Sequence, residues 1–304
     1  MNVGTKVRRP NLATAGALRV AALALLWGSS FLWIKVALRG FPPIHITTVR
    51  LAIGAAVLGA WLYLAHGRLP RGLTVWLHLA VAATVANVVP YLLFAFGEQQ
   101  VDSNVAGMLN ATTPVWTALL AVLVRQEPRP NIWKTTGLTL GIAGTLLIFA
   151  PWGISSQFWT LGAAACLIAA ASYAVSFVYM ARFLAPRGLS ALELSTAQLI
   201  AATVISTIAT PFLGGWQAPD WRADALASLT VLGISTGLAY VINYRLIQED
   251  GATTASVVIY LLPVVAILLG AVVLGEIPAF HAVVGVGVVL IGVALARRVP
   301  RTRH

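Results

Sequence analysis

Long apolar runs separated by short polar segments dominate the chain. Most runs hold about 20 apolar residues, the length at which a helix crosses the hydrocarbon core of a bilayer. The segments between them are brief and rich in Gly, Pro and charge, as in His66–Gly72 and Arg125–Pro130. The pattern predicts an all-α integral membrane protein with ten spans: Leu18–Leu38, Ile44–Ala65, Thr74–Phe96, Ser103–Val124, Trp133–Ala150, Phe158–Leu184, Ala191–Leu213, Ala225–Ile247, Thr253–Leu274 and Phe280–Leu295.

One of these apolar segments occurs twice. Asp102–Glu127 is followed 149 residues later by Gly251–Glu276, and both copies begin with small residues and end in glutamate. A proline stands near the middle of each copy, at Pro114 and Pro263. Because proline removes a helical hydrogen bond and displaces the carbonyl four residues earlier, both helices are predicted to be interrupted. Carbonyls freed at membrane depth are tolerated where they meet protein or line a wet cavity.

The duplication extends along the whole chain. Pro90–Gln99 matches Ala239–Gln248 at the same offset of 149. Arg39–Arg50 matches Arg187–Gln198 at an offset of 148. Five spans per copy is an odd number, so the second copy is predicted to lie inverted relative to the first, as in many secondary transporters. The predicted divisions are an N-terminal cytoplasmic tail (1–17), a first five-helix repeat (18–150), a second, inverted repeat (151–296) and a basic cytoplasmic tail (297–304).

Composition and charge agree with a membrane location. Hydrophobic residues make up 59% of the 304 residues and charged residues 10%, with a mean hydropathy of +0.86. A soluble domain carries roughly 25% charged residues. The net charge of +11 comes from short loops and tails, and 16 of the 20 Lys and Arg residues fall on one side if both termini are cytoplasmic. This asymmetry predicts a multi-pass protein of the inner (plasma) membrane with both termini in the cytoplasm, and disfavours nucleic-acid binding.

Residues for catalysis or metal binding do not form a recognisable set. Cys166 is the single cysteine, and the five histidines form no metal-spaced pair. No combination of nucleophile, base and acid falls at membrane depth. We therefore expect no enzyme activity, no metal and no cofactor.

Glycines in the fifth and tenth spans indicate close helix packing. Gly137 and Gly141 form a GxxxG pattern with Gly144 one turn further on, and the tenth span contains Gly285, Gly287 and Gly292. Small residues let helix backbones approach each other in membranes. We expect this packing to lie within the chain.

Several motifs together resemble a known family. Trp27–Phe31 reads WGSSF, Arg50 lies alone early in the second span, the Pro114 helix closes on Glu127, and Leu274–Glu276 reads LGE. This combination resembles the EamA-type branch of the drug/metabolite transporter superfamily over nearly the whole chain. The resemblance implies a ten-helix inner-membrane carrier, often an exporter of amino acids or related metabolites.

The second repeat departs from the family pattern. Tyr173 stands where the first repeat has Trp27, and Gln198 stands where it has Arg50. No residues match the paired basic residues of the sugar-phosphate branch. The resemblance therefore disfavours phosphorylated substrates.

Polar and aromatic residues at helical spacing form the candidate substrate site. Asn87 and Tyr91, for example, share one face of the third span. Such groups line a cavity or satisfy each other by interhelical hydrogen bonds. Aromatic rings and neutral donors suit a zwitterion or a neutral amphipathic solute. The predicted substrate-binding residues are Trp27, Ser30, Asn87, Tyr91, Asn110, Thr113, Tyr173, Ser176, Tyr240, Asn243 and Tyr260.

Charged residues near the outer boundary are candidates for gating. Arg50 lies about 9 Å inside the second span at 1.5 Å per residue. An intramembrane arginine is a functional candidate, but an ion pair with Glu98, Asp102 or Glu276 would make it structural. The predicted gating set is Arg50, Glu98, Glu276, Pro114 and Pro263.

Together these features predict a secondary transporter that exports a small organic metabolite, an amino acid or a related amphipathic solute, by alternating access. The alternatives are a multidrug efflux carrier or, less favoured, a channel or receptor. The expected partners are a small-molecule substrate and the lipid bilayer. The coupling ion stays open, and the chain acts as a monomer or a homodimer.

Overall fold

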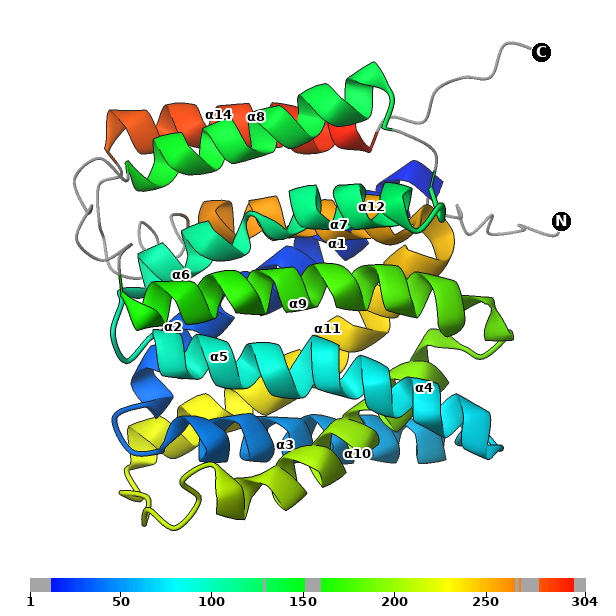
Figure 1. Cartoon of the computed structure of the whole chain (residues 1–304), viewed down its shortest axis with the longest axis vertical. Helices are drawn as coiled ribbons and strands as arrows, with labels where there is room; N and C mark the ends of the chain where they lie inside the picture. The colour runs from blue at the N-terminus through cyan, green and yellow to red at the C-terminus, as the bar shows by residue number, and fades with distance from the viewer. Residues whose placement is uncertain (1–11, 128–129, 151–159, 266–267, 269–278, 298–304) are drawn as a thin grey trace, which may run out of the picture.

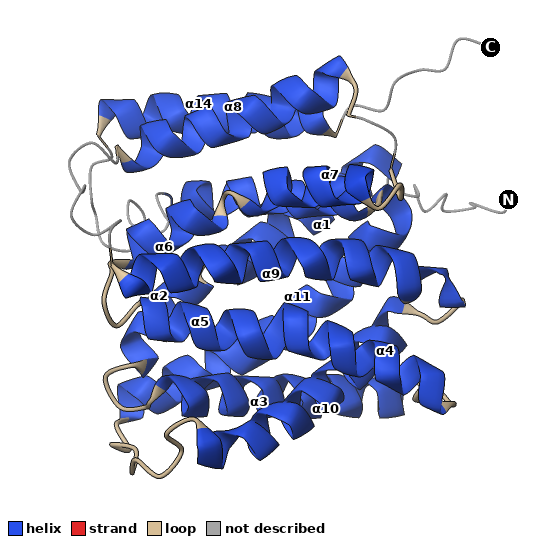
Figure 2. Ribbon diagram, viewed as in Figure 1, coloured by secondary structure: helices blue, strands red, loops and turns tan. Residues whose placement is uncertain are grey.

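The computed structural model describes residues 12–127, 130–150, 160–265, 268 and 279–297. This part of the chain is helical and contains no strand (Figure 2). Eight helical stretches are long and apolar enough to cross a membrane: Gly16–Ala37, Pro43–Leu64, Leu73–Gly97, Val105–Leu123, Ile132–Phe149, Leu161–Arg187, Ala191–Phe212 and Ala223–Asp250. Two shorter apolar stretches, Ala252–Val265 and Phe280–Ala296, are consistent with the ninth and tenth predicted spans. The predicted all-α membrane fold is confirmed.

Several of these stretches consist of more than one helix. The elements are α1 (Leu12–Gly28), α2 (Ser30–Ala37), α3 (Pro43–Leu64), α4 (Leu73–Ala83), η1 (Thr84–Val88), α5 (Val89–Gly97), α6 (Ser103–Asn110), α7 (Thr113–Leu123), α8 (Ile132–Phe149), α9 (Leu161–Phe183), η4 (Ala185–Arg187), α10 (Ala191–Ala209), η5 (Thr210–Phe212), α11 (Ala223–Asp250), α12 (Ala252–Ser256), η6 (Val257–Leu261) and α14 (Phe280–Ala296).

The helices run back and forth across one bundle (Figure 1). The start of α1 and the end of α14 lie at the same end of this bundle, which we call the terminal end; the opposite end is the distal end. Helix α3 packs against α10 and α11, and α9 packs against α5 and α7. The pair α8 and α14 forms one edge of the molecule.

The helices are interrupted next to prolines, as predicted. Helix α6 ends at Asn110 and α7 begins at Thr113, directly before Pro114. In the second copy, a 3-10 segment over Val257–Leu261 precedes Pro263. Both interruptions follow from the missing amide hydrogen and the steric clash of proline.

Glycines bring α8 and α14 into backbone contact within the chain. A Cβ atom on Gly144 would lie 2.7 Å from the backbone nitrogen of Val289. A Cβ atom on Gly292 would lie 2.8 Å from the carbonyl oxygen of Gly137. The two helices therefore pack as the GxxxG pattern predicts, and each depends on the other's lack of side chains.

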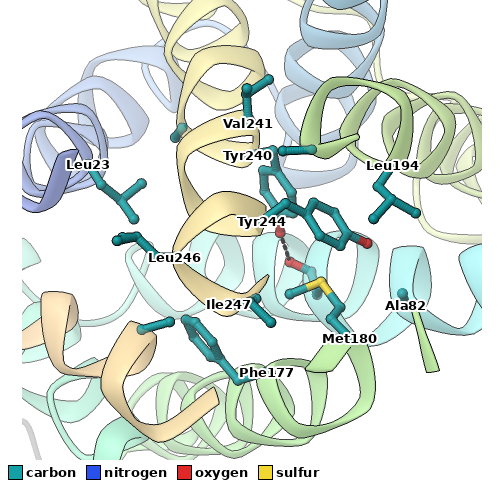
Figure 3. Packing of buried hydrophobic residues seen from close by; sticks show 14 of the residues in the cluster. Leu23, Ala82, Phe177, Met180, Leu194, Tyr240, Val241, Tyr244, Leu246 and Ile247 are labelled. Carbon is teal, nitrogen blue, oxygen red and sulfur yellow. Dashed lines mark hydrogen bonds between the residues drawn. The ribbon is translucent and has the colours of Figure 1, made fainter. Parts of the chain in front are cut away.

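The largest buried cluster surrounds the terminal half of α11. Tyr240 and Tyr244 extend from this helix and are both almost completely buried (Figure 3). Phe177 and Met180 of α9 belong to the same cluster. This packing joins elements of both halves of the sequence and closes the bundle beside the candidate site.

Candidate functional site

A cavity lies between the middle and the distal end of the bundle. It has a volume of about 40 Å³, counted as the space that the centre of a water molecule can occupy. Residues from both halves of the sequence line it: Trp27, Ser30, Phe31, Ile34, Arg50, Tyr91, Phe94, Asn110, Tyr173, Phe177, Ile259 and Leu262.

The depth of the cavity follows from the helices that surround it. Helix α3 begins at the distal end, and Arg50 is in its third turn. Helix α5 ends at the distal end at Gly97, three residues beyond Phe94. Trp27, by contrast, lies near the end of α1, which starts at the terminal end. The cavity therefore extends from mid-bundle towards the distal end.

Six of the twelve residues that line the cavity are aromatic. Phe94 stacks on Tyr173 with ring centroids 5.9 Å apart, and Phe31 meets Phe94 edge-on at 5.6 Å. Trp27 meets Tyr240 edge-on at 6.3 Å, which connects the cavity to the buried cluster on α11. Such walls bind apolar and aromatic groups, and a few polar atoms orient the ligand.

Five of the predicted substrate-binding residues line this cavity. They are Trp27, Ser30, Tyr91, Asn110 and Tyr173. Arg50, predicted for gating, also lines it. Their contact with substrate stays a prediction.

The other six predicted residues are not among the cavity-lining residues. Thr113 donates to the carbonyl oxygen of Ala170 at 3.2 Å, and Ser176 donates to that of Tyr173 at 2.7 Å. The Tyr260 hydroxyl donates to the carbonyl oxygen of Leu138 at 3.1 Å, so its ring packs against α8. The Thr113 and Tyr260 bonds match the alternative of interhelical hydrogen bonding, whereas the Ser176 bond lies within α9. The six residues are Asn87, Thr113, Ser176, Tyr240, Asn243 and Tyr260.

The prediction omitted the apolar half of the lining. Phe31 and Phe177 occupy matched positions in the two repeats, and Phe94 lies on the same helical face as Tyr91. The match between the repeats and the shared helical face were therefore sufficient to add these three residues to the predicted site. Ile34 and Leu262 gave no signal, because an aliphatic residue that lines a cavity has the same pattern as one in the core. Ile259 was marked only by its position four residues before Pro263.

Arg50 has an unusual environment for a membrane cation. Its side chain is buried, with 4% of the residue exposed. Nε donates to the hydroxyl of Thr236 at 3.0 Å, and the guanidinium carbon lies 3.8 Å from the centre of the Tyr91 ring. The ion pairs with Glu98 or Asp102 that the sequence allowed are not among its contacts, and Glu276 lies outside the described residues.

The proline interruptions border the cavity directly. Asn110 and Ile259 precede Pro114 and Pro263 by four residues, and both line the cavity. The Ile259 carbonyl oxygen accepts from the backbone nitrogen of Leu262 at the end of the 3-10 segment. A gating role for Pro114 and Pro263 stays a prediction.

At the distal end, the Lys35 side chain binds backbone carbonyls that follow the end of α5. The Lys35 ammonium donates to the carbonyl oxygens of Glu98 at 2.8 Å and Val101 at 3.2 Å. Glu98 itself is buried, with 1% exposed, rather than solvated. A cation at a helix C-terminus satisfies carbonyls that have no partner in the helix.

Ion pairs join several elements at the terminal end. Arg19 of α1 pairs with Glu249 of α11, and Arg297 pairs with Asp250 at 2.9 Å. Lys134 pairs with Glu127 at 2.9 Å. We call these three pairs the terminal lock; of the three, Arg19–Glu249 connects the first half of the sequence to the second.

Glu127 also binds the start of α12, accepting from the backbone nitrogen of Thr253 at 3.1 Å. Burial by itself raises the pKa of Glu127. The hydrogen bond and charge of Lys134, together with the Thr253 bonds, outweigh burial and hold the pKa below its ordinary value of 4.5. Glu127 is therefore ionised at neutral pH and links the first half to the second.

A bundle whose described part has eight stretches long and apolar enough to cross a membrane, with a small internal cavity, is compatible with a membrane transporter, and the comparisons with known proteins identify that class. The model of the EamA-like transporter family matches residues 14–150 and again residues 160–298. The chain belongs to this family, whose members are transporters rather than enzymes.

Relatives from distant organisms match almost the whole chain. It is 28% identical over 274 residues to the uncharacterized transporter YdfC of Bacillus subtilis, covering 88% of this chain and 85% of that one. It is 27% identical to the uncharacterized inner membrane transporter YedA of Escherichia coli, covering 90% and 88%. A crystal structure with 20% identity superposes with a TM-score of 0.73 over 93% of this chain and 98% of the other, which shows the shared fold.

Proposed function

We propose that this chain is a secondary transporter that moves a small organic metabolite, an amino acid or a related amphipathic solute, outward by alternating access. The observation that supports this most strongly is the cavity, because it places aromatic walls and one buried cation between elements of both sequence halves. A site at the junction of two halves can be exposed to either side in turn when the halves move against each other.

Two matched hydrogen bonds support the arrangement of two related halves. Arg50 in the first half donates to Thr236 in the second at 3.0 Å. Gln198 in the second half donates to Asn87 in the first at 2.7 Å. Gln198 is the sequence counterpart of Arg50, and Thr236 is that of Asn87. Each half therefore contacts the other through equivalent positions, as two inverted repeats would.

The direction of opening is the next part of the proposal. The terminal lock and the cluster around Tyr240 and Tyr244 close the terminal half, whereas the cavity extends towards the distal end. The distribution of Lys and Arg supports a cytoplasmic position for the terminal end. The structure then represents a state that is closed to the cytoplasm.

The test is transport by the purified full-length chain in liposomes. We expect saturable, substrate-specific counterflow of an amino acid or related solute, because a carrier must bind its substrate before it reorients. Flux that rises linearly with concentration would instead indicate a channel.

A parallel growth screen addresses the multidrug alternative. Cells that overproduce the chain are exposed to toxic amino-acid analogues and to lipophilic cations. We expect protection against the analogues, because Arg50, the charged residue among the described residues that line the cavity, is positive and repels cations. Protection against the cations alone would favour the multidrug carrier.

A further inference from the structure

The buried charge of Arg50 has neutral partners. Its described contacts are a hydroxyl and an aromatic ring, those of Thr236 and Tyr91. A charge removed from water is costly unless an opposite charge and hydrogen bonds compensate it. Thr236 and Tyr91 occupy Nε and one face of the guanidinium, which leaves the terminal nitrogens to face other groups. Arg50 lines the cavity, so an anionic ligand group there would supply the missing charge.

The shape of the guanidinium and the other lining groups indicate which anion. A guanidinium binds a carboxylate through paired hydrogen bonds. Asn110 adds a neutral amide, the Ser30 hydroxyl donates to the Leu26 carbonyl oxygen at 3.1 Å and retains its acceptor capacity, and the rings of Phe94 and Tyr173 provide an apolar surface. A small solute with one carboxylate and an apolar body fits this set better than a solute with several charges.

The position equivalent to Arg50 in the second half is neutral. Gln198 is fully buried and bonded to Asn87 and to the Tyr244 hydroxyl. Two further amide atoms, Asn87 Nδ2 and Asn243 Oδ1, are buried and have no hydrogen-bond partner in the described part of the chain. Buried polar atoms are nearly always paired, so these two atoms need another explanation. Exposure to a polar cavity in a second state would provide partners for both.

We propose that Arg50 binds the substrate carboxylate while the cavity opens at the distal end. When the cavity opens at the terminal end, Gln198 and Asn243 line it in the place that Arg50 occupies in the first state. This inference rests on the proposed function and names its substrate class. The carboxylate is then bound by a cation at one face of the membrane and by neutral amides at the other. Affinity therefore differs between the faces, and it is higher at the distal face.

The first experiment is ligand binding by the purified full-length chain, read as a shift of the thermal unfolding midpoint. The probes are L-amino acids and aromatic carboxylates, each paired with its primary amide. We expect at least one carboxylate to stabilise the protein and its amide to bind at least about tenfold more weakly, since hydrogen bonds to a charged group are the stronger ones. In Arg50→Gln this difference disappears, whereas in Arg71→Gln, an exposed loop arginine, it persists.

The outcomes separate this inference from the proposed function. Equal binding of acids and amides that Arg50→Gln leaves unchanged would refute the carboxylate anchor but not the carrier. If no probe binds, the amino-acid substrate class fails along with the anchor.

The second experiment measures half-saturating concentrations at each face, using liposomes that hold the chain in one orientation. We expect the value at the distal face to be at least about tenfold lower for the carboxylate found above. Gln198→Arg should lower the value at the terminal face and reduce the difference. Equal values at the two faces in the native chain would overturn the asymmetry.

Discussion

Gln198 illustrates how one buried side chain connects the two halves of the molecule. Its amide nitrogen donates to Asn87 Oδ1 at 2.7 Å, and its amide oxygen accepts from the Tyr244 hydroxyl. Both ends of the amide are therefore occupied, and the residue is fully buried. Removing it leaves two polar partners unsatisfied, each at a cost of about 1–3 kcal/mol.

We predict that Gln198→Leu lowers the free energy of unfolding by about 2 kcal/mol or more, because Asn87 and Tyr244 both lose a partner. The measurement is thermal or denaturant unfolding of the purified protein in detergent. Gln99→Leu is the control, since Gln99 is exposed and the same change there leaves stability nearly unaltered. Similar behaviour of both variants would contradict the role of the buried amide.

At the scale of elements, α8 and α14 depend on which glycines face the partner helix. A Cβ atom on Gly285 would lie 2.7 Å from the carbonyl oxygen of Gly144, a contact with backbone that cannot move aside. A Cβ atom on Gly287 would meet no atom within 4 Å. The two glycines lie two residues apart in α14, so the same substitution can be compared at a packed and at an open position of one helix.

We predict that Gly285→Ala destabilises the protein by about 1–3 kcal/mol, the usual cost of forcing an extra carbon into a packed interface. Gly287→Ala should be neutral or slightly stabilising, because alanine favours the helix. Unfolding midpoints of the two variants in the same detergent provide the comparison. Equal midpoints would mean that the two helices do not pack as closely as described.

The link between Glu127 and α12 should depend on pH. The pKa of Glu127 is lowered in the folded protein, so the ionised form contributes stability above the ordinary pKa of 4.5, and this contribution is lost as the pH falls through the lowered pKa. We predict that Glu127→Gln is less stable than the native chain at pH 7. The difference should shrink towards acid pH. A difference that stays constant with pH would exclude the charge of Glu127 as its cause.

At the scale of the whole molecule, the terminal lock favours one state of the bundle. Arg19 and Glu249 retain 28% and 52% side-chain exposure, so the pair is partly solvated. Pairs of this kind contribute about 0.2–1 kcal/mol. A contribution of that size cannot hold the bundle shut alone, but it shifts a two-state equilibrium by up to about fivefold.

We predict that Arg19→Glu changes the transport rate by up to about fivefold while protein yield stays the same, since it weakens the closed state and places two like charges together. The exchanged double variant Arg19→Glu/Glu249→Arg should restore the native rate, because it re-forms the pair with opposite polarity. Counterflow into liposomes measures both. A double variant as altered as the single one would show that the pair does not govern the equilibrium.

Much of this architecture was predictable from local patterns. The apolar runs placed the helices to within a few residues, as the predicted span Thr74–Phe96 and the helical stretch Leu73–Gly97 show. Proline chemistry located the break before Pro114. The π-helical turn at Thr84–Val88 was not predicted, because a single extra residue in a helical turn leaves no period in the sequence.

The candidate site was predictable only in part. Helical spacing identified Tyr91 and Tyr173, which line the cavity, but also Tyr260, which packs against α8. A polar stripe shows that a helix face needs partners, and it does not show whether those partners are another helix or a solute.

By itself, the sequence determined that this protein is helical, spans the membrane many times, and carries a lone arginine at depth, because hydropathy, helix length and proline act over short distances along the chain. Only the tertiary structure decided that Arg50 contacts Thr236 and Tyr91 rather than Glu98 or Asp102, and that it lines a cavity with residues up to 212 positions away, such as Leu262. Those relations depend on how helices distant in sequence rotate and pack against each other, and no local pattern fixes that rotation.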